Sequence, residues 1–189
     1  KVIRQGRADV VTDTIETFTA DGIRLASGTE LKADIIVTAT GLNLQLFGGA
    51  EISRNGEPVR LADLMAYKGM MLSGLPNLAF TIGYTNASWT LKADLVSEFV
   101  CRILNFMDEH GYDTVEPQHP GDTVAERPLL DFTPGYVRRA LDWLPEAGER
   151  TPWRLKQNYL FDLRLIRHGK VDDEGLKFSR QPARVTASV

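Results

Sequence analysis

The residues best placed for chemistry form a polar turn between an apolar run and a long helix-forming segment. The apolar run 78–82 is followed by Gly83 and Tyr84, and the turn and helix start are Thr85, Asn86, Ala87, Ser88 and Trp89. A strand, a turn that contains glycine and a long helix direct free backbone N–H groups and the positive end of a helix dipole toward a partly negative ligand. The same pattern also fits an ordinary βα unit whose helix is capped by side-chain oxygens of this turn.

The sequence contains no motif for binding a pyrophosphate. No two of its 16 glycines are spaced as G-x-G, so the dinucleotide-binding fingerprint G-x-G-x-x-G is absent. Gly69 and Gly74 have the spacing of a phosphate-binding P-loop, but Leu75 stands where that loop requires lysine. The chain therefore has no pyrophosphate-binding loop of its own.

Other common catalytic and metal-binding sets are also missing from the sequence. No G-x-S-x-G motif occurs, and the serines lie far in sequence from His110, His119 and His168. Cys101 and the three scattered histidines do not make a zinc site, and the lack of a C-x-x-C pair argues against a disulfide reductase. We expect Cys101 to be an inert thiol packed at the apolar face of its helix. The sequence thus assigns no catalytic residue and no metal ligand to this chain.

Composition and charge exclude several classes of protein. Of the 189 residues, 43% are hydrophobic and 25% are charged, which is typical of a globular chain with a core rather than a disordered or fibrous one. A net charge of -3 with mixed signs argues against a nucleic-acid partner. No apolar stretch reaches the ~18 residues of a membrane span, so we expect no transmembrane segment. The single cysteine predicts a cytoplasmic protein, and the first residue, Lys1, suggests an excised piece.

The pattern of apolar and turn residues predicts strands in the first half of the chain. Residues 9–31 predict a small antiparallel meander with tight turns at Asp21–Gly22 and Ser27–Gly28. The run 33–39 is rich in β-branched residues and shows no polar alternation, which is typical of a strand covered on both faces, as in a parallel sheet. The run 78–82 predicts a second strand of this kind.

The segment from Trp89 to Met107 predicts an amphipathic helix about 28 Å long that packs against a sheet. We expect Lys92 and Arg102 on its polar face, and Glu98 and Arg102 in a favourable i,i+4 ion pair. For Lys92 we expect a solvated position or a structural ion pair rather than catalysis.

Prolines divide the C-terminal part of the chain into short pieces. Two of these pieces predict helices, Gly135–Leu144 and Leu155–Arg167. The adjacent carboxylates Asp172 and Asp173 lie in a predicted turn, and we expect a solvated loop rather than a metal or acid–base pair. Residues 181–189 predict a frayed terminus.

Several stretches of this sequence resemble one family of flavin enzymes. The segment 34–41, which ends in Ala-Thr-Gly, resembles one shared by flavin-containing and Baeyer–Villiger monooxygenases. The segment 76–84 and its helix resemble the last strand of their FAD domain and the helix that follows it. The similarity to the ethionamide-activating subgroup of the Baeyer–Villiger monooxygenases rests on three further stretches, residues 65–74, 85–95 and 151–159. The resemblance extends from about Gly22 to Arg180.

The resemblance implies an NADPH-dependent enzyme in which FAD is reduced and O₂ adds at flavin C4a, so that the peroxide attacks a ketone or oxidises a sulfur. In the family, the helix after the last FAD-domain strand points its N-terminus at the pyrimidine edge of the flavin. This role falls here on the segment from Gly83 to Trp89. The Ala-Thr-Gly turn implies that Thr40 and Gly41 line the region of FAD and NADPH. Trp89 is then either a wall of the flavin or substrate site or a core aromatic residue.

The implied fold class is α/β, an incomplete two-dinucleotide-binding flavoprotein with the C-terminal part of a Rossmann-type FAD domain, a small antiparallel meander and a helical tail. Residues 1–41 would hold the meander and the last strand before the Ala-Thr-Gly crossover. Residues 42–110 would hold the C-terminal strand and helix of the FAD domain, and residues 111–189 a helical extension divided by prolines.

The FAD and NADPH fingerprints and the catalytic arginine of the family would precede this chain. We therefore expect the fragment alone to be inactive and to hold neither cofactor tightly. The unpaired edges of the predicted strands 34–38 and 78–82 predict self-association. An alternative from a different class stays open, a stand-alone α/β binding or assembly module without redox activity.

Overall fold

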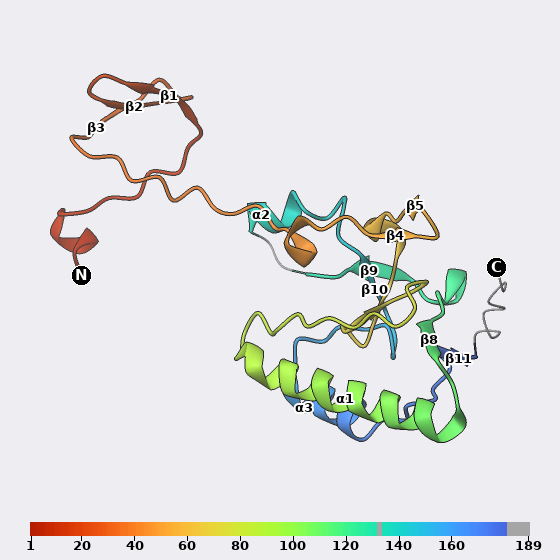
Figure 1. Ribbon diagram of the computed structural model, residues 1–189. Coiled ribbons are helices and arrows are strands. Elements are labelled where there is room, and N and C mark those ends of the chain that lie inside the picture. Colours follow the sequence, from red (N-terminus) through yellow and green to blue (C-terminus); the bar gives the residue numbers. More distant parts are fainter. Residues whose placement is uncertain (132–133, 181–189) are drawn as a thin grey trace. The chain divides into compact units, whose positions relative to one another are not determined.

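The computed structural model describes residues 1–131 and 134–180 and divides the chain into two compact units. The first unit is Lys1–Gly41, and the second begins at Leu42 (Figure 1). Both mix short helical and extended segments, and every strand ladder among the described residues is antiparallel. The predicted frayed terminus, residues 181–189, lies outside the described residues.

The first unit contains the predicted meander. Strand β2 (Gly22–Leu25) pairs with β1 (Ile15–Thr19) on one side and with β3 (Glu30–Lys32) on the other. The tight turn between β1 and β2 and the turn at Ser27–Gly28 lie where the sequence predicts them. The meander prediction is therefore confirmed.

The predicted strand 33–39 does not form. Residues 35–45 have no regular secondary structure, and Ile35 and Val37 are each 83% exposed. The β-branched side chains supply strand propensity, but a strand also needs a neighbour that completes its hydrogen-bond ladder. No strand in the described part of the chain pairs with this run, so the prediction of a strand covered on both faces is wrong here.

The predicted strand 78–82 in the second unit also lacks a ladder. Leu78, Phe80 and Ile82 are half-buried and alternate with exposed Ala79 and Thr81, as in an extended segment with one face against the core. Phe80 donates its backbone N–H to the Met70 carbonyl at 2.8 Å. The segment is therefore extended but belongs to no sheet, and the predicted parallel sheet is not found among the described residues.

Four small antiparallel ladders form the strands of the second unit as the structure describes it. They are β4 (Ser53–Arg54) with β5 (Glu57–Pro58), β6 (Ala66–Tyr67) with β7 (Met71–Leu72), β8 (Thr114–Pro117) with β11 (Leu176–Ser179), and β9 (Glu126–Pro128) with β10 (Glu146–Gly148). Short 3-10 turns occur at Ile3–Gln5, Leu46–Gly49, Leu61–Asp63 and Gly121–Thr123.

The longest element is the helix α1 (Trp89–His110), which begins where the sequence predicts and runs one turn further. Gly111 ends it in the left-handed conformation with φ 65°, a common helix C-terminus because glycine has no Cβ to clash. The buried face of α1 carries Lys92, Leu95, Val96, Phe99, Ile103 and Met107. No helix among residues 1–131 and 134–180 is long and apolar enough to cross a membrane.

The predicted ion pair between Glu98 and Arg102 is not present. Glu98 pairs instead with Arg167 at 2.7 Å. The Arg102 guanidinium donates to the carbonyls of Ile166, Arg167 and Gly169 at 2.7, 3.0 and 2.6 Å. These carbonyls lie at the end of a helical turn, where they lack partners within the helix, and the five donors of arginine satisfy several of them at once.

The C-terminal segment is less helical than predicted. Helix α2 (Gly135–Arg138) is much shorter than the predicted helix 135–144, while α3 (Tyr159–Asp162) continues into a π-helical turn, Leu163–Arg167. Four of the strands named above also lie in this segment. The predicted helical tail is therefore a region of both short helices and short strands.

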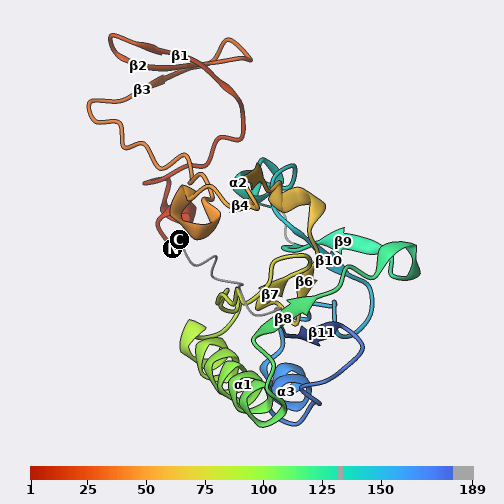
Figure 2. The ribbon, with the colours of Figure 1, turned by 45° about the vertical axis from the view of Figure 1, so that its right-hand side comes forward.

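The main core packs α1 against the C-terminal segment and the loop before α1. Figure 2 shows α3, β8 and β11 near α1. The core contains side chains from the loop before α1, from α1 itself and from the strands, namely Met65, Tyr67, Met70, Met71, Leu95, Val96, Phe99, Ile103, Met107, Val115, Val124, Trp153, Ile166 and Leu176. A second cluster, around Ala66, Leu72, Leu75, Leu129 and Ala147, holds Phe47, Phe80 and Ile82 against it.

We predict that Leu95→Ala lowers the free energy of unfolding by about 2–5 kcal/mol, because it opens a cavity in this core. Leu104→Ala on the same helix is the matched control, since Leu95 is 0% exposed and Leu104 is 53% exposed. The control should cost no more than about 0.5 kcal/mol beyond its change in helix propensity. Urea unfolding followed by circular dichroism measures both, and equal losses would contradict the orientation of α1.

Candidate functional site

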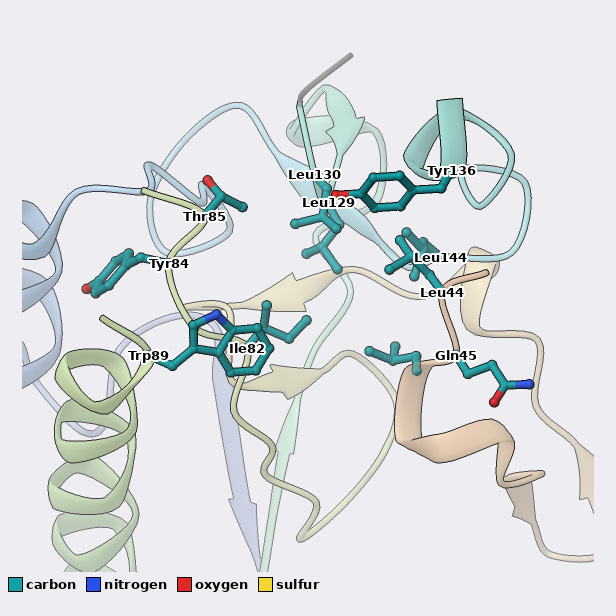
Figure 3. Close-up of a pocket in the computed structure, with 12 residues that line it drawn as sticks. Leu44, Gln45, Ile82, Tyr84, Thr85, Trp89, Leu129, Leu130, Tyr136 and Leu144 are labelled. Atoms are coloured by element: carbon teal, nitrogen blue, oxygen red, sulfur yellow. The ribbon is translucent and has the colours of Figure 1, made fainter. Parts of the chain in front are cut away.

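A cavity of about 380 Å³ in the second unit lies beside the turn that precedes α1 (Figure 3). Three stretches of chain line it, and most of the lining side chains are apolar. They are Leu44, Gln45, Leu46, Ile82, Gly83, Tyr84, Thr85, Trp89, Leu129, Leu130, Tyr136 and Leu144. Its size is within the range of pockets for small molecules and cofactors.

Trp89 forms part of the cavity wall and packs directly on the backbone of Gly83. A Cβ at Gly83 would lie 2.1 Å from Cγ of the indole, so no residue larger than glycine fits there. Trp89 is 61% exposed, and Figure 3 shows its ring beside Ile82. The interpretation of Trp89 as a core aromatic residue is therefore wrong. Trp89 lies in the wall of the cavity.

The polar turn is held from the C-terminal segment by Gln157. The backbone N–H of Thr85 donates to Oε1 of Gln157 at 3.0 Å, and Nδ2 of Asn86 donates to the Gln157 carbonyl at 3.1 Å. Ser88 occupies the N-cap position of α1, but its hydroxyl bonds to the Thr90 hydroxyl at 2.7 Å and makes no capping bond. The predicted side-chain cap is therefore not formed by Ser88.

A buried ion pair lies directly behind this turn. Nζ of Lys92 is 2.8 Å from Oδ2 of Asp162, and the Tyr84 hydroxyl donates to the same oxygen at 2.9 Å. The side chains of Lys92 and Asp162 are 1% and 2% exposed. Lys92 also donates to the Lys68 carbonyl at 3.2 Å. Lys92 thus lies on the buried face of α1 and not on the polar face as predicted, whereas the structural ion pair is confirmed.

Burial changes the acid–base properties of this cluster. Desolvation lowers the pKa of Lys92, because water no longer stabilises the ammonium, and the nearby Asp162 carboxylate opposes this shift. Desolvation also raises the pKa of Tyr84, and its hydrogen bond to Asp162 raises it further. The raised pKa keeps Tyr84 protonated, as a hydrogen-bond donor, at neutral pH.

A second cluster of the same composition lies nearby, around Lys68. Its Nζ is 2.8 Å from Oδ2 of Asp173, which also accepts a hydrogen bond from the Tyr67 hydroxyl at 2.8 Å. Burial lowers the pKa of Lys68 and raises that of Tyr67. The expectation of a solvated Asp173 is therefore wrong, because this carboxylate neutralises a lysine that the fold has buried. Asp172 is exposed, as expected.

The two clusters hold the structure and do not form a reactive surface of the cavity. Among the buried groups described above only Tyr84 lines it, and Figure 3 shows that its ring points away from the cavity, toward the C-terminal segment. A ligand in the cavity would meet apolar walls, the Trp89 indole and the polar groups of Thr85 and Gln45. In residues 1–131 and 134–180, no three His, Cys, Asp or Glu side chains gather as a metal site would require.

The structure brings together part of the predicted site. Gly83, Tyr84, Thr85 and Trp89 line the cavity, while Asn86, Ala87 and Ser88 lie in the exposed turn between them. Thr40 and Gly41 are exposed residues at the end of the first unit, and Gly41 has φ 102°. Sequence reasoning missed the other walls, which come from residues 44–46 and from Leu129, Leu130, Tyr136 and Leu144. The one local signal for these walls in the sequence was the pair of apolar residues Leu129 and Leu130 in a mostly polar region.

We predict that Asp162→Ala lowers the free energy of unfolding by about 3–5 kcal/mol, because it leaves the buried Lys92 ammonium without a partner. Glu98→Ala is the matched control, since its pair with Arg167 is equally short at 2.7 Å but both side chains are 40% exposed. That control should cost less than about 1 kcal/mol. Chemical unfolding at neutral pH measures both variants, and similar losses would show that burial does not govern the Lys92 pair.

Comparison with known proteins shows what this chain is similar to. It is 67% identical over 188 residues to the FAD-containing monooxygenase EthA of Mycolicibacterium smegmatis, covering 100% of this chain and 38% of that protein. It is 68% identical over 185 residues to EthA of Mycobacterium tuberculosis, covering 98% of this chain and 38% of that protein. It is also 43% identical over 182 residues to the probable FAD-binding monooxygenase AlmA of Acinetobacter baylyi, covering 96% of this chain and 36% of that protein.

No family model and no solved structure matches the chain. The chain spans little more than a third of the length of the curated relatives it matches. High identity over nearly all of its residues confirms the resemblance inferred from its motifs. The chain is therefore related, along its whole length, to a part of the FAD-containing monooxygenases of the EthA group.

Proposed function

We propose that this chain forms one side of the flavin site of an FAD- and NADPH-dependent monooxygenase, which carries out Baeyer–Villiger oxidation of ketones or oxygenates sulfur. The observation that carries the proposal is the place of residues 83–89. They form the turn that leads into the 22-residue helix α1 and the first residue of that helix, at the wall of an apolar cavity of about 380 Å³. The similarity to FAD-containing monooxygenases supports FAD as the ligand of this wall. NADPH and the ketone or sulfur substrate rest on the resemblance of the sequence motifs.

The residues present fit the ring of a flavin better than a complete FAD. The cavity offers apolar side chains for the faces of a planar ring and places the N-terminus of α1 at its edge. Ser88 does not cap the first turn of α1, so its side chain does not compete for these amides. No glycine motif for a pyrophosphate occurs in the sequence. We therefore assign the phosphates and the adenine of FAD to another part of the protein.

The contribution of this chain to the reaction would be electrostatic and steric. When bound, the flavin supplies the electron transfer and the activation of oxygen. The N-terminus of α1 would stabilise negative charge at the ring edge, by ~0.3–1 kcal/mol at an exposed helix end and more in a site that excludes water. The apolar walls around Leu44, Ile82 and Leu129 would exclude water from the ring. The Trp89 indole would limit how the ring or the substrate lies.

Within this proposal, residues 42–110 would belong to a Rossmann-type FAD domain that other segments complete, and Thr40 and Gly41 would lie near both cofactors. The exposed backbone at residues 34–38, which has no strand partner among the described residues, supports association by pairing with another chain. Cys101 is an exposed free thiol rather than the packed thiol we expected from the sequence, and it fits a reducing, cytoplasmic environment.

We predict that the 189-residue chain alone neither retains FAD nor oxidises NADPH, because it lacks a pyrophosphate-binding loop. The chain should also elute as an oligomer, because its extended segments have no ladder partners. Size-exclusion chromatography after incubation with FAD, with light scattering and flavin absorbance recorded together, tests both points. A yellow complex of fixed stoichiometry, or a clean monomer at high concentration, would contradict the respective point.

We predict that Trp89→Ala in the flavoprotein expressed from its complete gene weakens FAD retention or NADPH-driven oxygen consumption roughly tenfold, the equivalent of about 1.4 kcal/mol. Trp143→Ala is the matched control, because Trp143 is half-buried and does not line the cavity. That control should change either quantity less than about twofold. A colourless wild-type protein, or equal effects of the two variants, would refute the proposed flavin site.

A further inference from the structure

The cavity wall depends on a single oxygen atom from a distant part of the chain. Oδ2 of Asp162 accepts hydrogen bonds from both the Tyr84 hydroxyl and the Lys92 ammonium. Tyr84 lies in the turn that lines the cavity, and Lys92 lies in the first turn of α1. Asp162 therefore fixes the turn and the helix start relative to each other.

The same C-terminal segment holds the turn at a second point. Gln157 binds the backbone of Thr85 and the side chain of Asn86. Asn158 caps α3 by accepting a hydrogen bond from the Phe161 N–H at 2.9 Å, which fixes the helix that carries Asp162. Residues 157–162 thus contact the turn on both its backbone and its side chains.

The chemistry of these contacts requires a carboxylate rather than a residue that only packs. A buried ion pair contributes little net stability compared with apolar residues of the same volume, but it enforces one arrangement of its partners. Two donors, a phenol and an ammonium, converge on Oδ2, and a carboxylate oxygen accepts from both. An asparagine oxygen could also accept from both donors, but it would carry no charge to neutralise the buried ammonium and would bring N–H donors near it.

We propose that Asp162 is a positioning residue of the flavin site, which sets the orientation of residues 83–89 and so of Trp89 against the flavin ring. This rests on the proposed function. Asp162 is buried and does not line the cavity, so it acts through Tyr84 and Lys92 and not by contact with a ligand. Through it, residues 157–162 determine how one side of the cavity is shaped.

The cluster around Asp173 provides an internal control of the same chemistry. Tyr67 donates to Asp173 as Tyr84 donates to Asp162, but neither Tyr67 nor Asp173 lines the cavity. The Tyr67 ring packs against Trp153, with ring centroids 5.6 Å apart. Loss of the Tyr67 hydroxyl should therefore change the environment of the Trp153 ring, and loss of the Tyr84 hydroxyl should change that of the Trp89 ring.

The test compares Tyr84→Phe with Tyr67→Phe in the flavoprotein expressed from its complete gene and labelled with 5-fluorotryptophan. Each variant removes one hydroxyl and keeps the lysine–aspartate pair, and circular dichroism checks that the fold is kept. The ¹⁹F resonances are assigned by Trp89→Phe and Trp153→Phe. We expect Tyr84→Phe to move the Trp89 resonance by more than its line width and Tyr67→Phe to move that of Trp153. An unchanged Trp89 resonance in Tyr84→Phe would overturn the positioning role.

The flavin itself gives the second readout, in unlabelled preparations of the same two variants. Tyr84→Phe should shift the visible flavin absorbance bands and slow reduction of the flavin by NADPH several-fold at unchanged FAD content, whereas Tyr67→Phe should do neither. A Trp89 resonance that moves without any flavin response would overturn the proposal. A wild-type protein without FAD would instead refute the proposed function, and the ¹⁹F result would still show whether the hydrogen bond from Tyr84 to Asp162 orients the turn.

Discussion

Two lysine ammonium groups lie out of water in the second unit, and the structure depends on the carboxylates that neutralise them. Lys92 pairs with Asp162 and Lys68 pairs with Asp173, each at 2.8 Å. Removal of an ammonium from water costs several kcal/mol unless a counterion and further hydrogen bonds compensate it. In each pair the lysine and the carboxylate come from different segments, so neither segment can shift without leaving a buried charge unpaired. The start of α1 is therefore fixed to the C-terminal segment.

This constraint explains why the cavity wall has its shape. The turn before α1 is held from behind by Asp162 and from the side by Gln157, while Gly83 leaves room for the Trp89 indole. The result is a helix N-terminus without a Ser88 cap beside an apolar cavity. A wall of this kind can orient a planar ring and favour negative charge at its edge, but it contains no group that could itself transfer electrons. The chemistry of the proposed reaction therefore belongs to the cofactor.

Elements whose pattern is local were predicted well from the sequence. The helix α1 follows from apolar residues that repeat every three to four positions, although it continues to His110 rather than ending at Met107. The meander follows from turn residues between short β-branched runs. The predicted strands 34–38 and 78–82 have strong propensity but no ladder among the described residues, because a strand is completed by its neighbour and not by its own sequence. The prediction of a Glu98–Arg102 ion pair was wrong for a related reason. Arg102 donates instead to backbone carbonyls of a distant segment, at and after the π-helical turn.

The sequence by itself determined the long helix, the polar turn before it, the absence of a phosphate loop and the relationship to FAD-containing monooxygenases. Only the tertiary structure decided that Lys92 is buried against Asp162 and that Lys68 is buried against Asp173. It also decided that residues 44–46 and the side chains of Leu129, Leu130, Tyr136 and Leu144 line the same cavity as the turn. The physical reason is distance along the chain. Local periodicity specifies neighbours within about four residues, whereas Lys92 and Asp162 are 70 residues apart and meet only when the core has packed.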